Sequence, residues 1–394
     1  MKKLAAYTDD LPAGEAIVAR EETADGWRGL TAVGEVLNVT GANGHKPQMP
    51  DNDVVVIRNG SAKSRLPLEE RLRRVDEYLQ FYDRGLELAR RDCNVEALAE
   101  FERAVEVAPT LYARFNRALI LLALGRWREG FAEYFEVELH KPFMRPPVEA
   151  ALARGLKPWR GEDLDGSPLL VMHAHGLGDS IMALRYLPQL AQRGIKVALE
   201  VPDELAGLAG SVPRPGLISY FCPLLHLIGV LGIKPGQVNP APYLSIDRER
   251  VKGWRKHLGP GPHIGVAWLP GAKAIAGDYP RAIPLHLLVG KLSDQATLHA
   301  VQRGGVDEAQ ALGVATYEFA DLADCAAAML AMDRIISIDT CALHLAGAIG
   351  HPRVDGLLSH WASWRWRARW YSNISICKQL SADDWESALA QLGQ

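Results

Sequence analysis

The strongest constraint on the fold is an alternation of short apolar segments with amphipathic helical segments in the second half of the chain. Apolar runs of strand length occur at SPLLVMHAH, KVALEV and HIGVAWLPG, and helical patterns lie between them. ATLHAVQ and RIISIDT continue the series. This alternation is typical of βαβ units, which build parallel sheets covered by helices. The sequence therefore predicts an α/β protein with two Rossmann-like lobes in tandem.

The limits of these lobes are set by changes in the pattern. We place the first lobe, which is short for its kind, at residues 151–256 and the second at residues 257–380. The final segment, residues 381–394, contains SADDWESALAQLG and is predicted to be an amphipathic helix. Ser381 with Asp384 three residues later is the capping pattern expected at its start.

A helical segment at residues 68–150 precedes the lobes. Its apolar residues recur at helical spacing, and Phe81 is matched by Phe115 after 34 positions. Small, aromatic and helix-ending residues stand where a tetratricopeptide repeat has them, at Gly85, Ala97, Phe101, Ala104 and Pro109. We therefore predict an all-α, tetratricopeptide-like segment. Two such repeats either bind a protein partner or only pack against their neighbours, and the sequence leaves both alternatives open.

The N-terminal segment, residues 1–67, has a third character. Its valine-rich pieces EAIVARE, GLTAVGEVLNV and DVVVIRNG are separated by glycine, asparagine and aspartate. Short valine-rich runs between turn residues favour β-strands. We predict a small, β-rich N-terminal extension.

Composition excludes several classes of protein. The formal net charge of -3 provides no field for nucleic acid, so we expect no nucleic-acid partner. The five cysteines are scattered without C-x-x-C spacing, which argues against a zinc site and a disulfide scaffold. No segment approaches the roughly 20 apolar residues of a membrane helix, and the start lacks the apolar run of a signal peptide. The sequence thus predicts a cytoplasmic protein without a membrane span.

The first candidate site is HAHGLGDS, residues 173–180, where a predicted strand turns into a helix. Gly176 and Gly178 allow a tight turn and a close approach of the backbone to a ligand such as a phosphate. The carboxyl end of a parallel strand is where ligands of α/β sheets bind. Asp179 is either an N-cap of the helix or a catalytic carboxylate, and the sequence leaves both roles open.

The second candidate site is SIDTCALHLAGA, residues 337–348, which again predicts a strand followed by a helix. Asp339 and Thr340 stand at the junction, where free N–H groups and the helix dipole favour a phosphate. Thr340 can cap the helix and donate to a phosphate oxygen. His344, one turn further on, is either a packed helical histidine or a residue that reaches the same ligand.

A third candidate, AWLPGAKAIAGDYPRAIPL at residues 267–285, is a strand followed by a loop with basic residues. Lys273 and Arg281 in such a loop suit a diphosphate group. The alternative is that these charges, Lys273 above all, are only solvated. The cluster of Trp361, Trp364, Trp366 and Trp370, which alternates with arginines, is open to two interpretations. It is a platform on which sugars or bases stack, or it packs where the chain returns to the first lobe, with arginines on the rings.

These motifs together resemble the bacterial tetratricopeptide-repeat glycosyltransferases that are related to the heptosyltransferase family. The resemblance covers roughly residues 75–385. It rests on the order and spacing of short motifs, namely Pro158-Trp159-Arg160-Gly161-Glu162-Asp163-Leu164, Gly176-Leu177-Gly178-Asp179, Arg185-Tyr186, Pro242-Tyr243-Leu244, Ile264-Gly265-Val266-Ala267-Trp268, Asp339-Thr340 with His344-Leu345-Ala346-Gly347-Ala348, and Trp364-Arg365-Trp366.

The resemblance implies a GT-B fold with an active site between an acceptor-side first lobe and a nucleotide-sugar-side second lobe. Asp179 corresponds to the acidic residue near the acceptor, a candidate general base of an inverting transfer. Asp339, Thr340 and His344 correspond to the donor-side junction, and Arg281 to a basic residue against the diphosphate. Enzymes of this fold commonly need no bound metal, and we expect no cofactor.

The activity that the resemblance implies is transfer of a sugar from a nucleoside-diphosphate donor to a hydroxyl acceptor. The acceptor is a surface glycan, a lipid-linked glycan or a protein. The alternative is a catalytically degenerate relative that acts as a binding or scaffold module through its helical repeats. The loop after Trp268, which reads LPGAKAIAGDYP, departs from the family pattern and favours this alternative.

Overall fold

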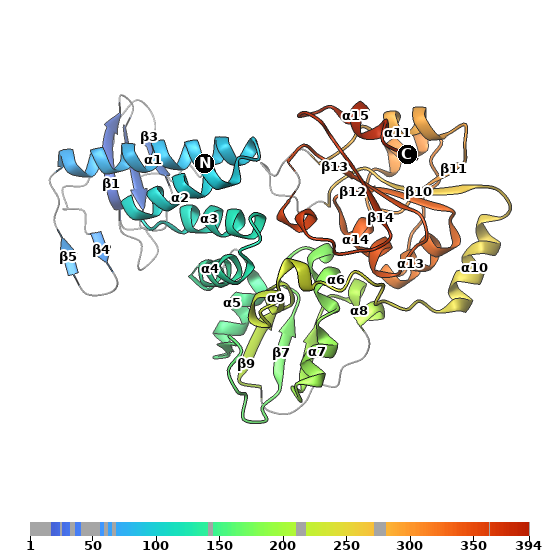
Figure 1. The fold of residues 1–394 in the computed structure, drawn as a ribbon, viewed down its shortest axis with the longest axis horizontal. Coiled ribbons are helices and arrows are strands. Elements are labelled where there is room, and N and C mark those ends of the chain that lie inside the picture. Colours follow the sequence, from blue (N-terminus) through green and yellow to red (C-terminus); the bar gives the residue numbers. More distant parts are fainter. Residues whose placement is uncertain are drawn as a thin grey trace. The chain divides into compact units, whose positions relative to one another are not determined.

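The computed structural model describes residues 17–23, 26–31, 36–40, 56–58, 62–64, 68–140, 145–209, 218–271, 281–361 and 363–393. The chain divides into two compact units, Met1–His140 and Lys141–Gln394 (Figure 1). The domain boundaries within these units stay a prediction from the sequence.

The N-terminal unit begins with short antiparallel strands. β1 (Ile17–Thr23), β2 (Gly26–Thr31) and β3 (Val36–Thr40) form one sheet in chain order, and β4 (Val56–Arg58) pairs with β5 (Ala62–Ser64). β1, β3 and β4 lie largely within the three valine-rich pieces of the sequence, where hydrophobic β-branched residues favour extended backbone.

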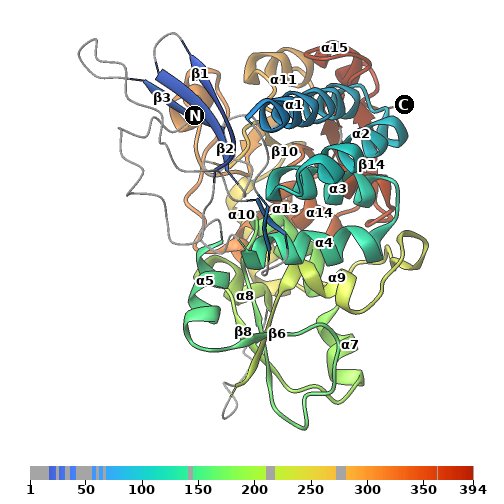
Figure 2. The same ribbon diagram turned by 90° about the vertical axis from the view of Figure 1, so that its left-hand side faces the viewer.

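Four helices complete this unit. They are α1 (Leu68–Arg90), α2 (Asn94–Val107), α3 (Leu111–Ala123) and α4 (Trp127–His140). Consecutive helices lie side by side, as Figures 1 and 2 show. Small residues permit the close approach: a Cβ added to Gly85 would lie 2.8 Å from the ring of Phe101. The segment is therefore helical with paired helices, and its assignment to the tetratricopeptide class stays a prediction.

The second unit contains two fully parallel sheets. The first has the strand order β6-β9-β7-β8, and the second has the order β11-β10-β12-β13-β14. The strands are β6 (Lys157–Pro158), β7 (Leu169–Met172), β8 (Val197–Glu200), β9 (Tyr220–Pro223), β10 (His263–Ala267), β11 (Thr297–Ala300), β12 (Arg334–Ile338), β13 (Val354–Leu358) and β14 (Ile374–Lys378). The mixed α/β character with parallel sheets that the sequence predicted is confirmed.

Helices cover these sheets. They are α5 (Pro146–Ala153), α6 (Leu177–Leu184), α7 (Leu187–Gln192), α8 (Asp203–Ala209), α9 (Leu227–Val230), α10 (Arg248–Leu258), α11 (Leu285–Leu292), α12 (Val306–Ala311), α13 (Leu322–Ala331), α14 (Cys341–Ala348) and α15 (Trp385–Leu389). Every residue of β10, β12 and β13 is buried, as expected of parallel strands with helices on both faces. Leu288 of α11 and Trp385 of α15 belong to the core on one face, while Leu343 of α14 packs against Gly356 on the other.

The strand order locates the places where a ligand can bind. In the second sheet the strands follow the order 2-1-3-4-5 when they are numbered along the chain, which puts a topological switch point between β10 and β12. In the first sheet the order β8-β7-β9 puts a switch point between β7 and β9. The crevice at the carboxyl ends of the two strands at such a point is the usual ligand site of open α/β sheets.

Two predicted helices differ from the structure. The segment IMALRYLPQLAQRG forms α6 and α7 rather than one helix, because Pro188 at the start of α7 has no N–H to donate to the preceding turn. The final helix begins at Trp385 and not at Ser381. Asp383 has a φ of +60°, which a continuous helix cannot contain, and Asp384 caps α15 by accepting from the N–H of Ser387.

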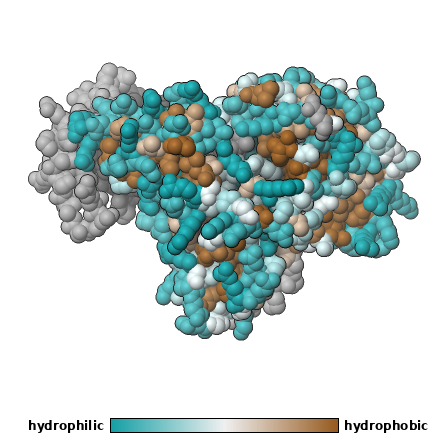
Figure 3. All heavy atoms as spheres, in the orientation of Figure 1, coloured by the Kyte–Doolittle hydropathy of each residue, from teal (hydrophilic) through white to brown (hydrophobic). Residues whose placement is uncertain are grey.

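The surface is mainly polar on the face that Figure 3 shows, with hydrophobic residues in separate patches. Among the helices of the described residues, none has both the length and the apolar character that a membrane crossing requires.

Candidate functional site

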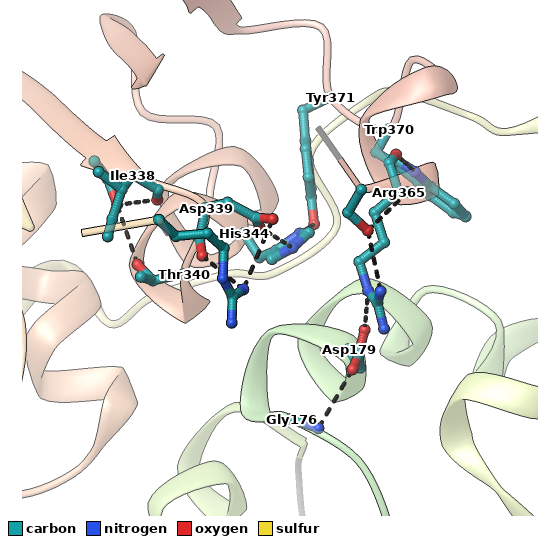
Figure 4. A network of polar contacts seen from close by, with 12 residues as sticks. Gly176, Asp179, Ile338, Asp339, Thr340, His344, Arg365, Trp370 and Tyr371 are labelled. Carbon is teal, nitrogen blue, oxygen red and sulfur yellow. Dashed lines mark hydrogen bonds and ion pairs between the residues drawn. The ribbon is translucent and has the colours of Figure 1, made fainter. Parts of the chain in front are cut away.

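The two strand-to-helix corners singled out in the sequence meet in the second unit. Helix α6 follows β7 at the first switch point, and α14 follows β12 at the second. Gly178 of α6 lies against α14, since a Cβ added there would be 2.7 Å from Cδ2 of His344. Figure 4 shows Asp179 on one side of this contact and Asp339, Thr340 and His344 on the other. The fold therefore brings the two predicted corners together, and Gly178 is required by the packing of the two helices.

The close approach of α6 and α14 gives a test of this arrangement. We expect Gly178→Ala to lower the free energy of unfolding by about 1–3 kcal/mol, because its methyl group would collide with the ring of His344. Gly290→Ala in α11 is the matched control, since a Cβ there meets no atom within 4 Å. In the control the gain in helix propensity should raise stability by about 0.5–1 kcal/mol. Denaturant unfolding that gave both variants the same sign of change would contradict the described contact.

Asp179 stands in the first turn of α6, and 12% of its side-chain surface is exposed. Its Oδ2 accepts a hydrogen bond from the N–H of Gly176 at 3.3 Å, which completes the N-terminal cap of α6. The N-cap residue itself is Gly176, so Asp179 acts in the cap from the third helical position and not as the N-cap proposed as one alternative. Its Oδ1 accepts from Nε–H of Arg365 at 2.5 Å (Figure 4).

The charge of Asp179 is set by two opposing effects. Burial raises the pKa of this carboxyl. The guanidinium of Arg365 lowers the pKa by more than that, through its charge and its hydrogen bond, so that the pKa of Asp179 is about 2. His175 and His344 act in the same direction as Arg365. Asp179 is therefore a carboxylate at neutral pH, and Arg365 is its counterion.

Arg365 comes from the loop that connects β13 to β14 at the carboxyl edge of the second sheet. It lies in a short 3-10 helix, Trp364–Arg367. Its guanidinium lies 4.7 Å from the centre of the Trp364 ring, and its Nη1 donates to Oγ of Ser363 at 3.1 Å. The indole N–H of Trp370 donates to the carbonyl of Arg365. Arg365 and Trp370 thus contact α6, and Arg365 lies on the Trp364 ring, as the packing interpretation of the tryptophan cluster predicted.

His344 lies one turn into α14 and is buried. Nδ1 of its ring is 2.9 Å from the hydroxyl oxygen of Tyr371, and Nε2 is 4.0 Å from Oδ1 of Asp339. The ring stacks on Trp366 with 4.9 Å between centres. Burial lowers the pKa of His344 to about 4, although Asp339 and Asp179 oppose the shift. His344 is therefore neutral at pH 7 and is part of the packed contact as well as of the corner.

The second corner also contains Asp339, Thr340 and Arg281. Thr340 is the N-cap of α14, but its side chain makes no capping bond; its hydroxyl lies 3.2 Å from Oγ of Ser337. Arg281 donates from Nη1 to the carbonyl of Asp339 at 3.2 Å, and the same nitrogen is 3.8 Å from Oδ2 of Asp339. A basic side chain thus stands beside the N-terminus of an eight-residue helix. Lys273 lies outside the described residues.

Sequence reasoning missed the role of Arg185, which is the C-cap of α6. Its Nη1 donates to the carbonyls of Asn239 at 2.8 Å and Trp370 at 2.9 Å. Its guanidinium also lies over the rings of Tyr243 and Tyr371, at 4.3 and 5.0 Å from their centres. The pair Arg185-Tyr186 was noted as a motif. Only the fold shows that this arginine ties the first lobe to the β13–β14 loop and to the segment between α9 and α10, which we call the connecting segment.

The connecting segment between the lobes is fastened on both sides. The N–H groups of Tyr243 and Leu244 both donate to the carbonyl of Ala348 at the end of α14. The hydroxyl of Tyr243 donates to the carbonyl of Ile181 in α6 at 2.7 Å. A histidine pair that the sequence did not reveal lies at the first switch point, where the rings of His175 and His226 are 5.2 Å apart.

The arrangement combines groups that suit transfer chemistry at a negatively charged leaving group. A buried carboxylate faces a helix N-terminus, which attracts anions, and Arg281 lies beside that terminus. Arg365 donates to the carboxylate, and its charge also acts on His344. The site can therefore hold an anion on the second lobe and a base on the first.

Comparison with known proteins gives distant similarities. No protein-family model matches the chain. The protein FlbA of Caulobacter vibrioides is 27% identical over 336 residues, which cover 71% of this chain and 54% of FlbA. The chain thus spans about half the length of this curated relative.

Several solved structures also resemble the chain. The glycosyl transferase family 9 protein of Veillonella parvula has a TM-score of 0.41 and 12% identity, over 56% of this chain and 88% of its own. The E. coli ADP-heptose lps heptosyltransferase II has a TM-score of 0.39 and 13% identity, over 57% and 94% of the two chains. The E. coli heptosyltransferase TibC has a TM-score of 0.36 and 12% identity, over 60% and 73%. All three are glycosyltransferases, and their similarity to this chain is distant.

Proposed function

We propose that the second unit is a glycosyltransferase that transfers a sugar from a nucleoside-diphosphate donor to a hydroxyl group. The observation that carries the proposal is the meeting of the two corners: Asp179 at the first switch point faces Asp339, Thr340 and His344 at the second. Ligands of parallel sheets bind at such points, and here two of them share one location. The GT-B architecture, with acceptor on the first lobe and donor on the second, is part of the proposal.

In this mechanism the second lobe binds the donor's diphosphate. The N–H groups at the start of α14, the Thr340 hydroxyl and the Arg281 guanidinium are the groups that would hold it. Asp179 accepts the proton of the acceptor hydroxyl while the oxygen of that hydroxyl attacks the anomeric carbon. The bond from that carbon to the phosphate oxygen breaks, and the nucleoside diphosphate leaves with the negative charge. The attack inverts the anomeric centre and uses no metal.

The identity of the acceptor follows from the same proposal only as a class. It is a hydroxyl of a surface glycan, a lipid-linked glycan or a protein. The helices α1–α4 are proposed to recruit a protein partner, because solenoid-like helical pairs present surfaces for binding. The cytoplasm is the compartment in which nucleoside-diphosphate donors and reduced cysteines are expected.

A second candidate is a degenerate protein that keeps the architecture without catalysis. The specific observation in its favour is that Asp179 is bonded to Arg365 and that Gly178 contacts His344 directly. In that function the lobes are a platform and the helical repeats bind the partner. Ligand binding separates the two candidates, because only the enzyme must recognise a nucleoside diphosphate.

The deciding experiment is a thermal-shift series with uridine, guanosine, adenosine and cytidine diphosphates. We expect one of them to raise Tm progressively with concentration, since a ligand at 100 times its Kd adds about 2.7 kcal/mol to the folded state. Arg281→Ala should remove most of the shift, because it deletes the cation beside α14. Lys252→Ala, on the exposed face of α10, is the control and should keep it. No shift with any of the four would favour the scaffold.

A further inference from the structure

The loop between β13 and β14 lies over both halves of the candidate site. From this loop Arg365 bonds to Asp179 of the first lobe, while Trp366, the next residue, stacks on His344 of the second lobe. The hydroxyl of Tyr371, further along the same loop, is 2.9 Å from Nδ1 of His344. One short segment thus links the proposed base to the proposed donor corner (Figure 4).

We propose that Arg365 is a donor-responsive counterion: it neutralises Asp179 while the site is empty and moves to the donor's diphosphate when the donor binds. The carboxylate is then released to act as the base. This inference rests on the proposed function and adds to it a residue and an order of events, in which the base becomes active only after the donor is in place.

The geometry of the ion pair shows why a release is needed. Both oxygens of Asp179 are engaged, Oδ1 by Arg365 and Oδ2 by the N–H of Gly176. A general base works best when its pKa lies near the operating pH, and a carboxylate held by a guanidinium is too weak. The charged or titratable groups with the largest effect on Asp179 are Arg365, His175 and His344. Arg365 is the strongest of them, so its departure would leave burial to raise the pKa of Asp179.

The surroundings of Arg365 permit such a move. Its side chain keeps about 20% of its surface exposed, and it sits in a four-residue 3-10 helix, not within a long element. Its positive charge already lowers the pKa of His344 in α14, so it is within electrostatic reach of the donor corner. A diphosphate carries more negative charge than one carboxylate and presents paired oxygens to the planar guanidinium. The exchange of partners therefore keeps Arg365 paired in both states.

The test is to follow the carboxyl of Asp179 directly. In protein labelled with ¹³C at the aspartate carboxyls, the Asp179 signal is identified by its absence in Asp179→Asn. We expect its titration midpoint to rise by at least about one pH unit when the nucleoside diphosphate selected by thermal shift is added to saturation. Arg365→Met should raise the midpoint without any ligand. If the diphosphate binds and the midpoint stays where it was, this inference is wrong while the proposed function stands. If no nucleoside diphosphate binds, this inference and the proposed function are both wrong.

A second measurement tests the other half of the exchange. Arg365→Met should weaken nucleoside-diphosphate binding by about 10–100-fold, the loss expected for one charge-assisted pair, and Arg365→Lys should recover part of it. Arg369→Met, an exposed arginine of the same loop, is the matched control and should bind as the wild type does. A structural role alone would lower stability in Arg365→Met but leave diphosphate affinity unchanged, and that outcome overturns the proposal even if the labelled protein cannot be titrated.

Discussion

Asp179→Asn is expected to lower the rate of sugar transfer by about 10²–10⁴-fold, the usual loss when a general base is removed. The amide oxygen can still accept from the N–H of Gly176, so the cap of α6 survives. What disappears is the negative charge that takes the proton of the acceptor. The rate is measured with saturating donor, or as donor hydrolysis where water takes the place of the acceptor.

The control for this variant is Asp203→Asn in the first turn of α8, which removes an exposed carboxylate and should leave the rate unchanged. Binding of the nucleoside diphosphate should persist in Asp179→Asn, because the donor corner is on the other lobe. Undiminished turnover in Asp179→Asn would rule out Asp179 as the base. Loss of both turnover and diphosphate binding would indicate that the substitution disrupts the structure of the site and does not merely remove the general base.

The second large effect is expected at Arg185. Arg185→Met should lower the free energy of unfolding of the second unit by about 2–4 kcal/mol, because it removes charge-assisted hydrogen bonds and cation–π contacts at once. The carbonyls of Asn239 and Trp370 would lose their donor, and the rings of Tyr243 and Tyr371 their cation. Denaturant unfolding followed by tryptophan fluorescence reports the change.

Arg185→Lys tests the geometry of this contact. An ammonium group has no planar face to lay on the two tyrosine rings and cannot reproduce the fork of a guanidinium, so it should recover less than half of the lost stability. Arg193→Met at the exposed end of α7 is the control and should change stability by less than about 0.5 kcal/mol. Equal stability of Arg185→Met and Arg193→Met would mean that Arg185 does not fasten the lobes.

The sequence predicted the parts of the fold whose signals are local. The strands β7, β8, β10, β11 and β12 lie in short, mainly apolar segments, and glycine turns or capping residues follow them. The two corners were found because a strand end, a turn and a helix start are adjacent in the chain. Their meeting could be expected only from the family resemblance, since contact between α6 and α14 joins residues more than 160 positions apart.

The elements that were missed carry signals that only tertiary contacts explain. β13 contains Asp355, a charged residue in a strand buried at every position, and so it does not look like a core strand. Its charge is matched by Arg334 of the neighbouring strand β12, whose Nε donates to Asp355 at 2.7 Å. β9 is four residues long and ends in a proline, which weakens any strand pattern.

In the candidate site, too, the sequence did not reveal residues whose partners are distant in the chain. Asp179, Asp339 and Thr340 were predicted from the corners, but Arg365 was not, because its motif lies in a tryptophan-rich loop whose position relative to the first lobe only the fold defines. The ion pair joins residues 186 positions apart. Arg185 was missed for the same reason: three of its partners, Asn239, Tyr243 and Trp370, come from segments distant in the chain.

The fastening of the connecting segment determines how the two lobes can part. The segment is held to the end of α14 by Tyr243 and Leu244, and to α6 near Arg185 by the Tyr243 hydroxyl. The groups of α6 that bond to the segment are the Ile181 carbonyl and, at the C-terminal end, Arg185, which donates to Asn239. Gly178 stands at the N-terminal end, roughly 10 Å from Arg185 along the helix axis. A rotation of one lobe against the other that keeps these bonds must have its axis near the C-terminal end of α6. The displacement is then greatest at the glycine turn, so a substrate can enter beside Asp179 without any break in the connection.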